Sequence, residues 1–596
     1  MRACVRVRVC GLAVAILAGS WCAMGAERQA RAIRRSDVVF MYDNPQRYEA
    51  YGATVMGWAG RRDADHIRAA HAAGVRQFSC SVGFLTEGRG VIDFSEDFLD
   101  AACRNLAGEP FIVPWLWDHQ HKGHKYYWWC TNSPLYRKYL FQRLAETVAA
   151  GCDGLHIDDY RGTSGSVTWR AGGFCPHCLA AFREYLARHV PAEKLAKLGI
   201  RDVKTFDYRR FLLDRGVKPD EYNRRRAGLP LAEEFHHFQV MADNDFVAAY
   251  HKRACELAGR KLTLSVNSGL SSPHALVVAP HLSYFCCEVG HGAPRRKPAT
   301  HPVYIYKLAD GLDRPVCSTA AGQDWAFVAE HKTYELVRTW AAMSYAFGHN
   351  LMAPHRQWCY TKAKGTHWTE APTDEYAWVY RFVRAQARLL DGYEAVAPVA
   401  VVYDNAANRR GRGRIEGICT DLAAANTPFR VAVAGDHWLP DYRLTAGDLA
   451  RARAVIVPKQ LDLDAAQRTV LDGVKAAGRL VTWPDRAGLT KLVPPPIRIE
   501  GAGNLWAVPR AKPGDRKAPV VIHLLNRNYD PKADRIVPRK DVTLHLRRDL
   551  LPGRKLTKVT AHAPKAKPLA LRATVGDTET TIALSHVGLW TLIELH

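Results

Sequence analysis

Beyond its N-terminal region the sequence has no apolar run close to the roughly 18 to 20 residues that cross a membrane. It also has no long run of Lys or Arg and no recognisable nucleic-acid-binding motif, so its formal charge of +24 comes from scattered residues. We therefore expect neither a membrane anchor nor a nucleic-acid partner. The charge reflects either a compositional bias or a preference for an acidic substrate.

The N-terminus has the layout of a cleavable export signal. Three arginines within the first eight residues precede a small and apolar stretch at 11–18, and small residues follow up to Ala26. This order predicts a signal peptide over 1–26, cleavage after Ala26, and a secreted or periplasmic protein.

Cysteines are too sparse for a fold that depends on disulfides. Twelve of the 15 cysteines lie beyond the predicted cleavage point. An exported protein can form disulfides, but small disulfide-dependent folds are far richer in cysteine. Many of these residues sit in apolar runs, where a buried free thiol is expected.

The region 36–392 alternates short apolar runs with amphipathic stretches, which is typical of parallel strands joined by helices. Eight strands over this length favour a (β/α)₈ barrel, with the largest insertion after the fourth strand; a doubly wound open sheet is the alternative. The predicted strands are Val38–Tyr42, Val75–Val82, Pro110–Trp117, Gly154–Asp158, Leu262–Asn267, Leu282–Glu288, Pro315–Thr319 and Asn350–Ala353.

Two further units follow the predicted barrel. The region 396–490 again alternates strand and helix patterns and predicts a small flavodoxin-like αβ domain. It lacks a Gly-x-Ser-x-Gly or Gly-x-Cys-x-Gly nucleophile turn, so we expect it to pack or to form a homo-oligomer. The region 497–596 shows only strand alternation and predicts a β-sandwich.

In a barrel the reactive side chains lie at the carboxyl ends of the strands. The segment 154–160 ends an apolar strand in Asp158 and Asp159. Alternation along this strand directs His156 and Asp158 into the barrel. Asp158 is therefore the first candidate for catalysis, with Asp159 and His156 as orienting groups; alternatively, the Asp pair caps the following loop.

Glycosidic bond cleavage generally requires a second carboxyl group. Glu288 ends another apolar run, and burial beside Phe285 and two cysteines would raise its pKa, as a general acid requires. The alternative is a salt-bridged residue at the rim, with Asp43 and Asp324 as reserve candidates. Asn267, at the end of the preceding strand, is a candidate for substrate binding.

Several predicted strand ends carry aromatic and polar side chains together. Sugars stack their C–H faces on aromatic rings and direct their hydroxyls to polar groups, although some of these tryptophans belong to the core. The candidates for substrate binding are Trp115, Trp117, His119, Trp325, His355 and Arg356.

Three segments in combination resemble a known family. The stretches 130–137, 153–160 and 174–186 are similar to glycoside hydrolase family 42 and the related hypothetical glycosyl hydrolases. This resemblance implies a barrel, an αβ domain like the β-galactosidase trimerisation domain, a terminal β-sandwich and a carbohydrate substrate. The family ends its fourth strand in Asp-Asn-Glu with the Glu as acid/base, but that Glu falls on Tyr160 here. The strand end instead resembles retaining enzymes of the α-amylase and dextranase type, in which the position of Asp158 holds the nucleophile.

The resemblance also implies a structural metal. Members of family 42 bind zinc through four cysteines, and Cys130, Cys175 and Cys178 match three of them, whereas Gly173 replaces the fourth. Three cysteines with His177 among them suit a tetrahedral zinc site. A Cys175–Cys178 disulfide or free thiols are the alternatives.

Together these features predict an exported, retaining glycoside hydrolase with Asp158 as nucleophile, Glu288 as acid/base, and no cofactor required for catalysis. One alternative is a carbohydrate-binding barrel without activity, because the family glutamate is missing. A second is a metal-dependent hydrolase that uses Asp118, His119 and His121.

Overall fold

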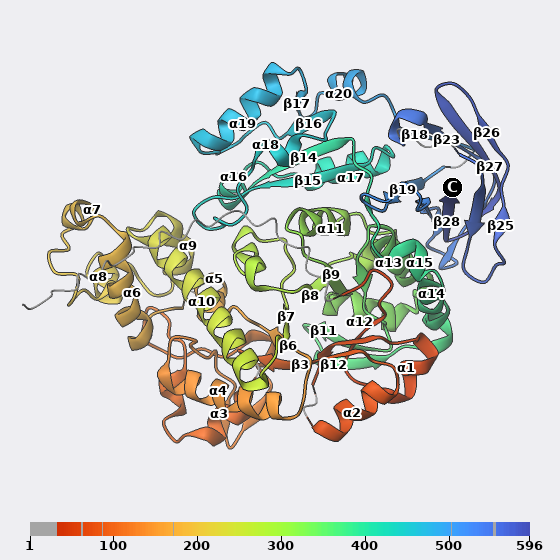
Figure 1. Ribbon diagram of the computed structural model, residues 1–596. Coiled ribbons are helices and arrows are strands. Elements are labelled where there is room, and N and C mark those ends of the chain that lie inside the picture. Colours follow the sequence, from red (N-terminus) through yellow and green to blue (C-terminus); the bar gives the residue numbers. More distant parts are fainter. Residues whose placement is uncertain (1–32, 61–62, 86, 171, 502, 552–555) are drawn as a thin grey trace, which may run out of the picture.

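The computed structural model describes residues 33–60, 63–85, 87–170, 172–501, 503–551 and 556–596, and shows a mixed α/β protein with several parallel sheets (Figure 1). The predicted signal peptide, 1–26, lies outside the described residues. Within the described ranges, no helix is both long enough and apolar enough to cross a membrane.

The first part of the chain contains eight parallel strands in two sheets. They form one sheet of five strands, in the order β1-β2-β3-β6-β7, and one of three, in the order β10-β9-β8. Their bounds are Val39–Met41 (β1), Val55–Ala59 (β2), Gln77–Gly83 (β3), Gly154–Asp158 (β6), Thr263–Val266 (β7), Phe285–Val289 (β8), Val316–Ala320 (β9) and Asn350–Leu351 (β10).

The two sheets approach each other at both edges. At one edge, Phe40 and Ala353 form a parallel bridge, and the Ala353 N–H donates to the Val39 carbonyl at 2.8 Å. At the other edge, the Ser283 N–H donates to the Leu264 carbonyl at 2.9 Å. The carboxyl ends of all eight strands therefore face the same way.

Seven of the predicted strands correspond to observed strands, but the prediction for Pro110–Trp117 was wrong. That segment contains the 3₁₀ turn η2 (Pro114–Leu116), because its two prolines fix φ and supply no N–H for a ladder. The eighth strand is instead β2, which the sequence prediction missed. Its short run Val-Met-Gly-Trp-Ala contains Gly57. A Cβ at Gly57 would lie 2.8 Å from Val39 Cγ1, so only glycine fits against β1 there.

Helices follow most of these strands, as the amphipathic stretches predicted. Asp63 caps the second helix by accepting the His66 N–H, and Ser133 precedes a proline at the start of the fourth. The helices around the eight strands are α1 (Pro45–Tyr51), α2 (Ala64–Ala72), α3 (Gly88–Phe94), α4 (Pro134–Ala149), α11 (Pro302–Gly311), α12 (Gly322–His331), α13 (Tyr334–Ala346), α14 (Thr373–Ala385) and α15 (Ala387–Leu390).

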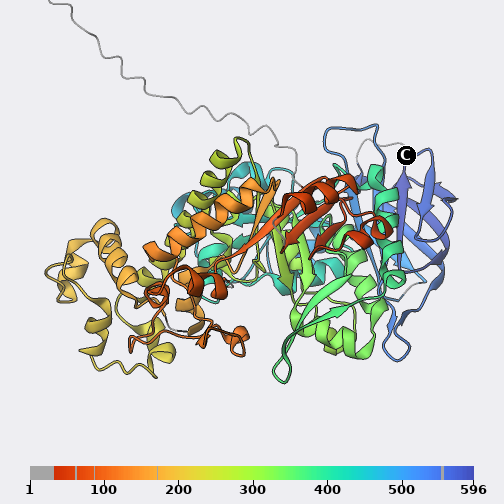
Figure 2. The same cartoon turned by 90° about the horizontal axis from the view of Figure 1, so that it is seen from below.

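The long insertion predicted after the fourth strand lies between β6 and β7. It has its own hydrophobic core, in which Phe174, Phe182, Tyr208 and Phe235 pack together. Figures 1 and 2 show it projecting from the side of the molecule opposite the C-terminal strands. Its helices are α5 (Gly162–Arg170), α6 (Pro176–His189), α7 (Ala192–Lys197), α8 (Tyr208–Leu213), α9 (Tyr222–Arg225) and α10 (Ala232–Ala258).

The region predicted as an αβ domain contains a four-stranded parallel sheet in the order β15-β14-β16-β17. The strands are β14 (Val399–Asp404), β15 (Phe429–Ala434), β16 (Ala454–Val457) and β17 (Leu480–Thr482), with the helices α16 (Asn405–Arg409), α17 (Glu416–Ala424), α18 (Ala446–Leu449), α19 (Ala465–Ala476) and α20 (Arg486–Leu492).

The C-terminal region contains two antiparallel sheets with a shared apolar core. The six-stranded sheet consists of β13 (Glu394–Ala395), β19 (Leu505–Ala511), β20 (Val520–Asn526), β28 (Trp590–Leu595), β24 (Val559–His562) and β25 (Leu569–Ala570); the four-stranded sheet consists of β18 (Ile497–Glu500), β23 (Arg539–Arg547), β27 (Glu579–Val587) and β26 (Ala573–Val575).

Candidate active site

Three polar residues lie together at the carboxyl ends of neighbouring strands. Asp158 ends β6, Asn267 directly follows β7, and Glu288 lies in β8. The residue directly before each of them is buried, whereas these three residues are partly accessible. They therefore line the open end of the strand layer, where reactive groups of such folds are expected.

The side-chain amide of Asn267 joins the two carboxyl groups. Its Nδ2 donates to Asp158 Oδ1 at 3.1 Å and to Glu288 Oε2 at 3.4 Å. Those two oxygens therefore lie no more than about 6.5 Å apart. This limit includes the roughly 5 to 5.5 Å between the carboxyl groups of retaining glycosidases.

Burial raises the pKa of both carboxyl groups. The pKa of Asp158 rises to about 6, although the Asn267 amide and the Asp159 N–H favour its charged form. The pKa of Glu288 rises to about 7, first through burial and then through the negative charge of Asp158. Near neutral pH the pair therefore holds one proton, and Glu288 is its favoured position.

Glu288 also lies against the start of α12, where the Gly322 N–H donates to its carboxylate and lowers its pKa in opposition to burial. The site requires glycine at position 322, because a Cβ there would lie 2.4 Å from the ring of Trp358.

Asp159 adopts a left-handed backbone conformation, with φ of 46°. In this turn its N–H donates to Asp158 Oδ1 at 2.9 Å. Burial raises the pKa of the Asp159 carboxyl well above its usual range, and the charges of Asp158 and Glu288 raise it further. Asp159 thus contacts Asp158 through its backbone N–H, and its role as an orienting group stays a prediction.

His156 precedes Asp158 by two residues in β6 and packs between side chains of the neighbouring strands. It is fully buried, with Nδ1 3.0 Å from Ser265 Oγ and its ring 4.2 Å from that of Trp58. Burial lowers the pKa of His156 to about 3, so the imidazole is neutral. The structure thus places it beneath the site and away from solvent.

Two other residues predicted to bind substrate are also buried. His355 stacks on Phe40 at 4.3 Å and is hydrogen-bonded through Nε2 to the Tyr42 carbonyl at 2.8 Å. Trp325 donates through Nε1 to Thr319 Oγ1 at 2.9 Å. Both side chains contact protein groups under the site, which is a supporting role rather than the predicted contact with substrate.

Tyr42 is a site residue that the sequence did not reveal. It follows β1 with φ of 60°. Burial raises the pKa of its phenol well above the usual range, and the nearby charges of Asp158 and Glu288 raise it further, whereas Arg356 opposes them. The phenol therefore lies beside the carboxyl pair and stays protonated at neutral pH. Its place at a strand end was the available signal.

The reserve carboxylates have other partners. Asp43 pairs with His66 and accepts the hydroxyl of Tyr48. Asp324 accepts the N–H groups of His291 and Ala293, both at 2.7 Å, and so holds the loop after β8.

The remaining residues predicted to bind substrate lie in the segment around η2 and in a later hairpin. Trp117 is exposed, Trp115 is half-buried, and His119 pairs with Asp118 at 2.9 Å. Arg356 is exposed on the hairpin of β11 (Arg356–Thr361) and β12 (Gly365–Glu370).

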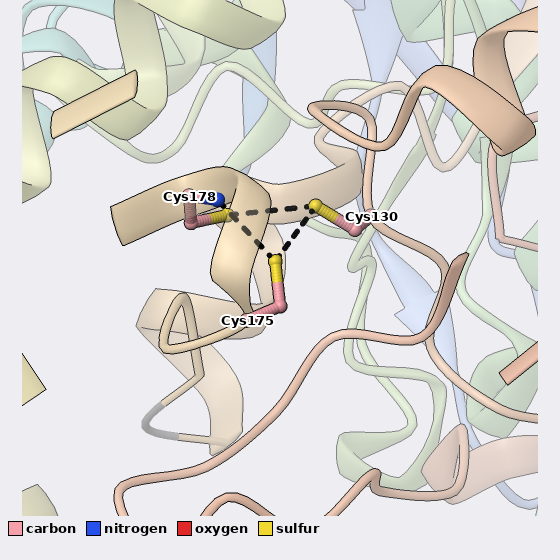
Figure 3. A group of neighbouring side chains, drawn as sticks. All are labelled: Cys130, Cys175 and Cys178. Atoms are coloured by element: carbon pink, nitrogen blue, oxygen red, sulfur yellow. Dashed lines mark hydrogen bonds between the residues drawn. The ribbon is translucent and has the colours of Figure 1, made fainter. Parts of the chain in front are cut away.

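Three thiols meet at the start of α6 (Figure 3). Cys130 Sγ lies 3.3 Å from Cys175 Sγ and 3.5 Å from Cys178 Sγ, and all three are buried. Cys175 and Cys178 start α6, and a fourth thiol, Cys103, is hydrogen-bonded to Cys130. Among the residues that the structure describes, this trio is the group of three or more His, Cys, Asp or Glu side chains whose donor atoms are close enough for a metal ion. Three buried thiols suit zinc.

The predicted alternative metal site is not assembled. His119 pairs with Asp118, whereas His121 pairs with Asp93 at 2.8 Å, so the two imidazoles face different carboxylates.

Comparisons with known proteins bear on this site. No family model matches the chain. It is 23% identical over 592 residues to an α-agarase of Thalassotalea agarivorans, covering 93% of this chain and 38% of that protein. It is also 23% identical over 621 residues to an α-agarase of Alteromonas agarilytica, covering 95% of this chain and 42% of that protein. The chain thus spans about two fifths of these relatives.

Among solved structures, α-L-fucosidase isoenzyme 2 from Paenibacillus thiaminolyticus matches 95% of this chain and 100% of its own, with a TM-score of 0.61 and 11% identity. At that identity the likeness concerns the fold. The similarity to the two α-agarases supports the predicted class, a glycoside hydrolase. The narrower resemblance to family 42 stays a prediction.

Proposed function

We propose that this protein is a retaining glycoside hydrolase that cleaves a polysaccharide with Asp158 and Glu288. The observation that carries the proposal is the Asn267 amide, which holds both carboxyl groups through hydrogen bonds of 3.1 and 3.4 Å. Support comes from the two α-agarase relatives and from a pair of carboxyl groups that holds one proton near neutral pH.

The residues divide the chemistry as follows. Protonated Glu288 gives its proton to the glycosidic oxygen while an oxygen of Asp158 attacks the anomeric carbon. The bond to the leaving sugar breaks, and a glycosyl ester on Asp158 remains. Glu288, now a carboxylate, removes a proton from water as the water oxygen attacks the same carbon and releases Asp158. Asn267 keeps both groups in place, and the Tyr42 phenol stays protonated near them.

The fold proposal is a closed (β/α)₈ barrel over 36–392, followed by an αβ domain over 396–490 and a β-sandwich over 497–596. The parallel bridge between Phe40 and Ala353 supports closure at one edge. The link between Ser283 and Leu264 supports it at the other. Export, cleavage after Ala26 and a homo-oligomer formed through the αβ domain are further parts of this proposal.

The proposed substrate is inferred from the two α-agarase relatives. Because both are α-agarases, we propose an agar-type galactan cleaved at an α-linkage. Sulfated and uronic polysaccharides form the second group to test, because the chain carries a formal charge of +24.

The test measures reducing sugar released from agarose and from neutral, sulfated and uronic polysaccharides. Wild type is compared with Asp158→Asn, Glu288→Gln and a control, Asp65→Asn, on the exposed face of α2. Release by wild type and the control alone supports the enzyme and both residues, and proton NMR of the first product distinguishes retention from inversion. Equal release by all four proteins would assign the chemistry to other residues. Calorimetric binding of a glycan without release by any protein would favour the alternative, a binding barrel without activity.

We further propose a structural zinc ion held by Cys130, Cys175 and Cys178. Cys103, beside Cys130, is the nearest thiol for a fourth position. Zinc there would join the start of α6 to the segment before α4 and would take no part in the reaction.

A further inference from the structure

Three tryptophans are exposed, although the described part of the chain buries most of its aromatic side chains. Trp117 is 54% exposed, Trp169 is 56% exposed and Trp368 is 44% exposed. Among the described residues, no other tryptophan is classed as exposed. They come from separate segments: Trp117 directly follows η2, Trp169 lies near the end of α5, and Trp368 lies in β12. Single exposed apolar residues need no explanation, but a group within one region marks a binding surface.

Side-chain and backbone contacts bring these segments together. The ring of Trp169 lies edge-on to Trp115 at 6.0 Å. The Thr366 hydroxyl, in β12, donates to the Trp115 carbonyl at 3.3 Å, which ties the hairpin to η2. Trp117 follows in the same turn, where Lys125 donates to its carbonyl at 3.1 Å. The three exposed rings thus come from segments that contact one another through Trp115 and its neighbours, and we call these three residues the tryptophan path.

The tryptophan path begins at the carboxyl pair. Trp368 lies edge-on to Tyr42 with ring centroids 4.5 Å apart, and the Tyr42 phenol lies beside Asp158 and Glu288. The Arg356 guanidinium covers the Trp368 ring at 5.0 Å. At the other end, α5 carries Trp169 and starts just after Asp158 and Asp159.

The elements beneath these rings are rigid enough to position them. Trp128 is buried, packs on Trp115 at 5.7 Å and donates through Nε1 to the Gly162 carbonyl at 2.7 Å, which anchors the start of α5. The six-residue pairing of β11 with β12 supports Trp368. Rings fixed in this way lose little conformational freedom when a ligand stacks on them.

We propose that Trp117, Trp169 and Trp368 bind sugar residues of a polysaccharide chain beyond those at the cleaved bond. The inference rests on the proposed function, which supplies the sugar at the carboxyl pair. Flat rings with an N–H at one edge suit the C–H faces and hydroxyls of a neutral glycan, and the path is continuous with the site that would cut it. The enzyme then favours long chains over short ones.

The kinetic test compares wild type with Trp117→Ala, Trp169→Ala and Trp368→Ala on agarose and on the shortest oligosaccharide that is cleaved. We expect kcat/KM on agarose to fall about 2- to 10-fold for each variant, the range for an aromatic contact, and the loss for Trp169→Ala and Trp117→Ala to be smaller on the short substrate. Trp169→Phe should recover most of the loss. The control is Leu257→Ala, an exposed apolar residue of α10.

A binding test separates this inference from the proposed activity. Affinity electrophoresis in gels containing agarose uses Asp158→Asn as the parent, so retardation reports binding without turnover. If the parent is retarded and added tryptophan substitutions abolish the retardation, the path binds glycan even if wild type cleaves nothing. The inference is wrong if Asp158→Asn with the added tryptophan substitutions is retarded as much as Asp158→Asn with Leu257→Ala. It is also wrong if the tryptophan variants lose kcat/KM equally on long and short substrates.

Discussion

Asn267 binds Glu288 through both ends of its amide: Oδ1 accepts the Glu288 N–H at 3.2 Å, and Nδ2 donates to Glu288 Oε2 at 3.4 Å. The first bond fixes the orientation of the amide, so its NH₂ group must face the carboxylates, and it reaches Asp158 as well. The neutral Asn267 side chain therefore lies between the carboxyl groups of Asp158 and Glu288. A cation there would instead hold both groups ionised and remove the general acid.

Replacement of Asn267 by Ala should lower kcat/KM about 10- to 100-fold, the value of a hydrogen bond to a charged group. It should also move the acid limb of the pH–rate profile to higher pH, because the amide lowers the pKa of Asp158 and of Glu288. The matched control is Asn408→Ala, whose amide bonds two carbonyls near β14. An acid limb that stays in place would show that Asn267 does not set the ionisation of the pair.

The pH–rate profile should be bell-shaped, with limbs at about 6 and about 7. Below the lower limb Asp158 is protonated and no longer attacks; above the upper limb Glu288 has lost the proton that it donates. Glu288→Gln, tested on a substrate with an activated leaving group that needs no acid, should lose the alkaline limb. Persistence of that limb would assign it to another group.

The same carboxyl groups should destabilise the fold at high pH. Their folded-state pKa values lie above the ordinary values, so the folded state binds more protons than the unfolded state and stability falls as pH rises from about 4 to about 7. Asp158→Asn and Glu288→Gln should therefore raise the melting temperature at pH 8 by about 2–4 °C, and change it little at pH 4. An equal effect at both pH values would point to packing rather than charge.

Tyr42→Phe should lower kcat about 10- to 100-fold and leave KM nearly unchanged, because burial and the adjacent carboxylates keep the phenol protonated as a hydrogen-bond donor. Tyr48→Phe, which removes a nearby phenol that bonds Asp43 instead, is the matched control. The assignment fails if the two variants have the same kcat.

The sequence revealed the elements whose patterns are local. The apolar runs that end in Asp158 and Glu288 are recognisable because a carboxylate after a buried strand is unusual. The run at 110–117 resembled a strand because it is apolar. Pro110 and Pro114, however, fix φ and supply no backbone N–H for pairing. Val55–Ala59 escaped notice because it is short and carries a glycine.

The site residues that were missed depend on tertiary contacts. A tyrosine at a strand end has no chemical signature until the chain places it beside two carboxylates, as Tyr42 is placed. Trp169 and Trp368 likewise look like core residues until packing leaves them exposed. Conversely, His156, His355 and Trp325 have the right chemistry for sugar binding, but the fold buries them.

Cys130, Cys175 and Cys178 should hold zinc in the purified protein. Purified protein should contain about one zinc per chain by metal analysis, and Cys178→Ser should lose the metal and lower the melting temperature, because zinc supplies folding free energy where ligands come from separate segments. Cys130 and Cys178 come from such segments, before α4 and within α6. Turnover per folded molecule should stay within about twofold of wild type, since in the described structure no thiol of the trio contacts Asp158 or Glu288. Cys419→Ser, which removes a buried free thiol elsewhere, should retain the zinc. A Cys175–Cys178 disulfide found by mass spectrometry of unreduced peptides, with no bound metal, would contradict the zinc site and identify the pair as a covalent link.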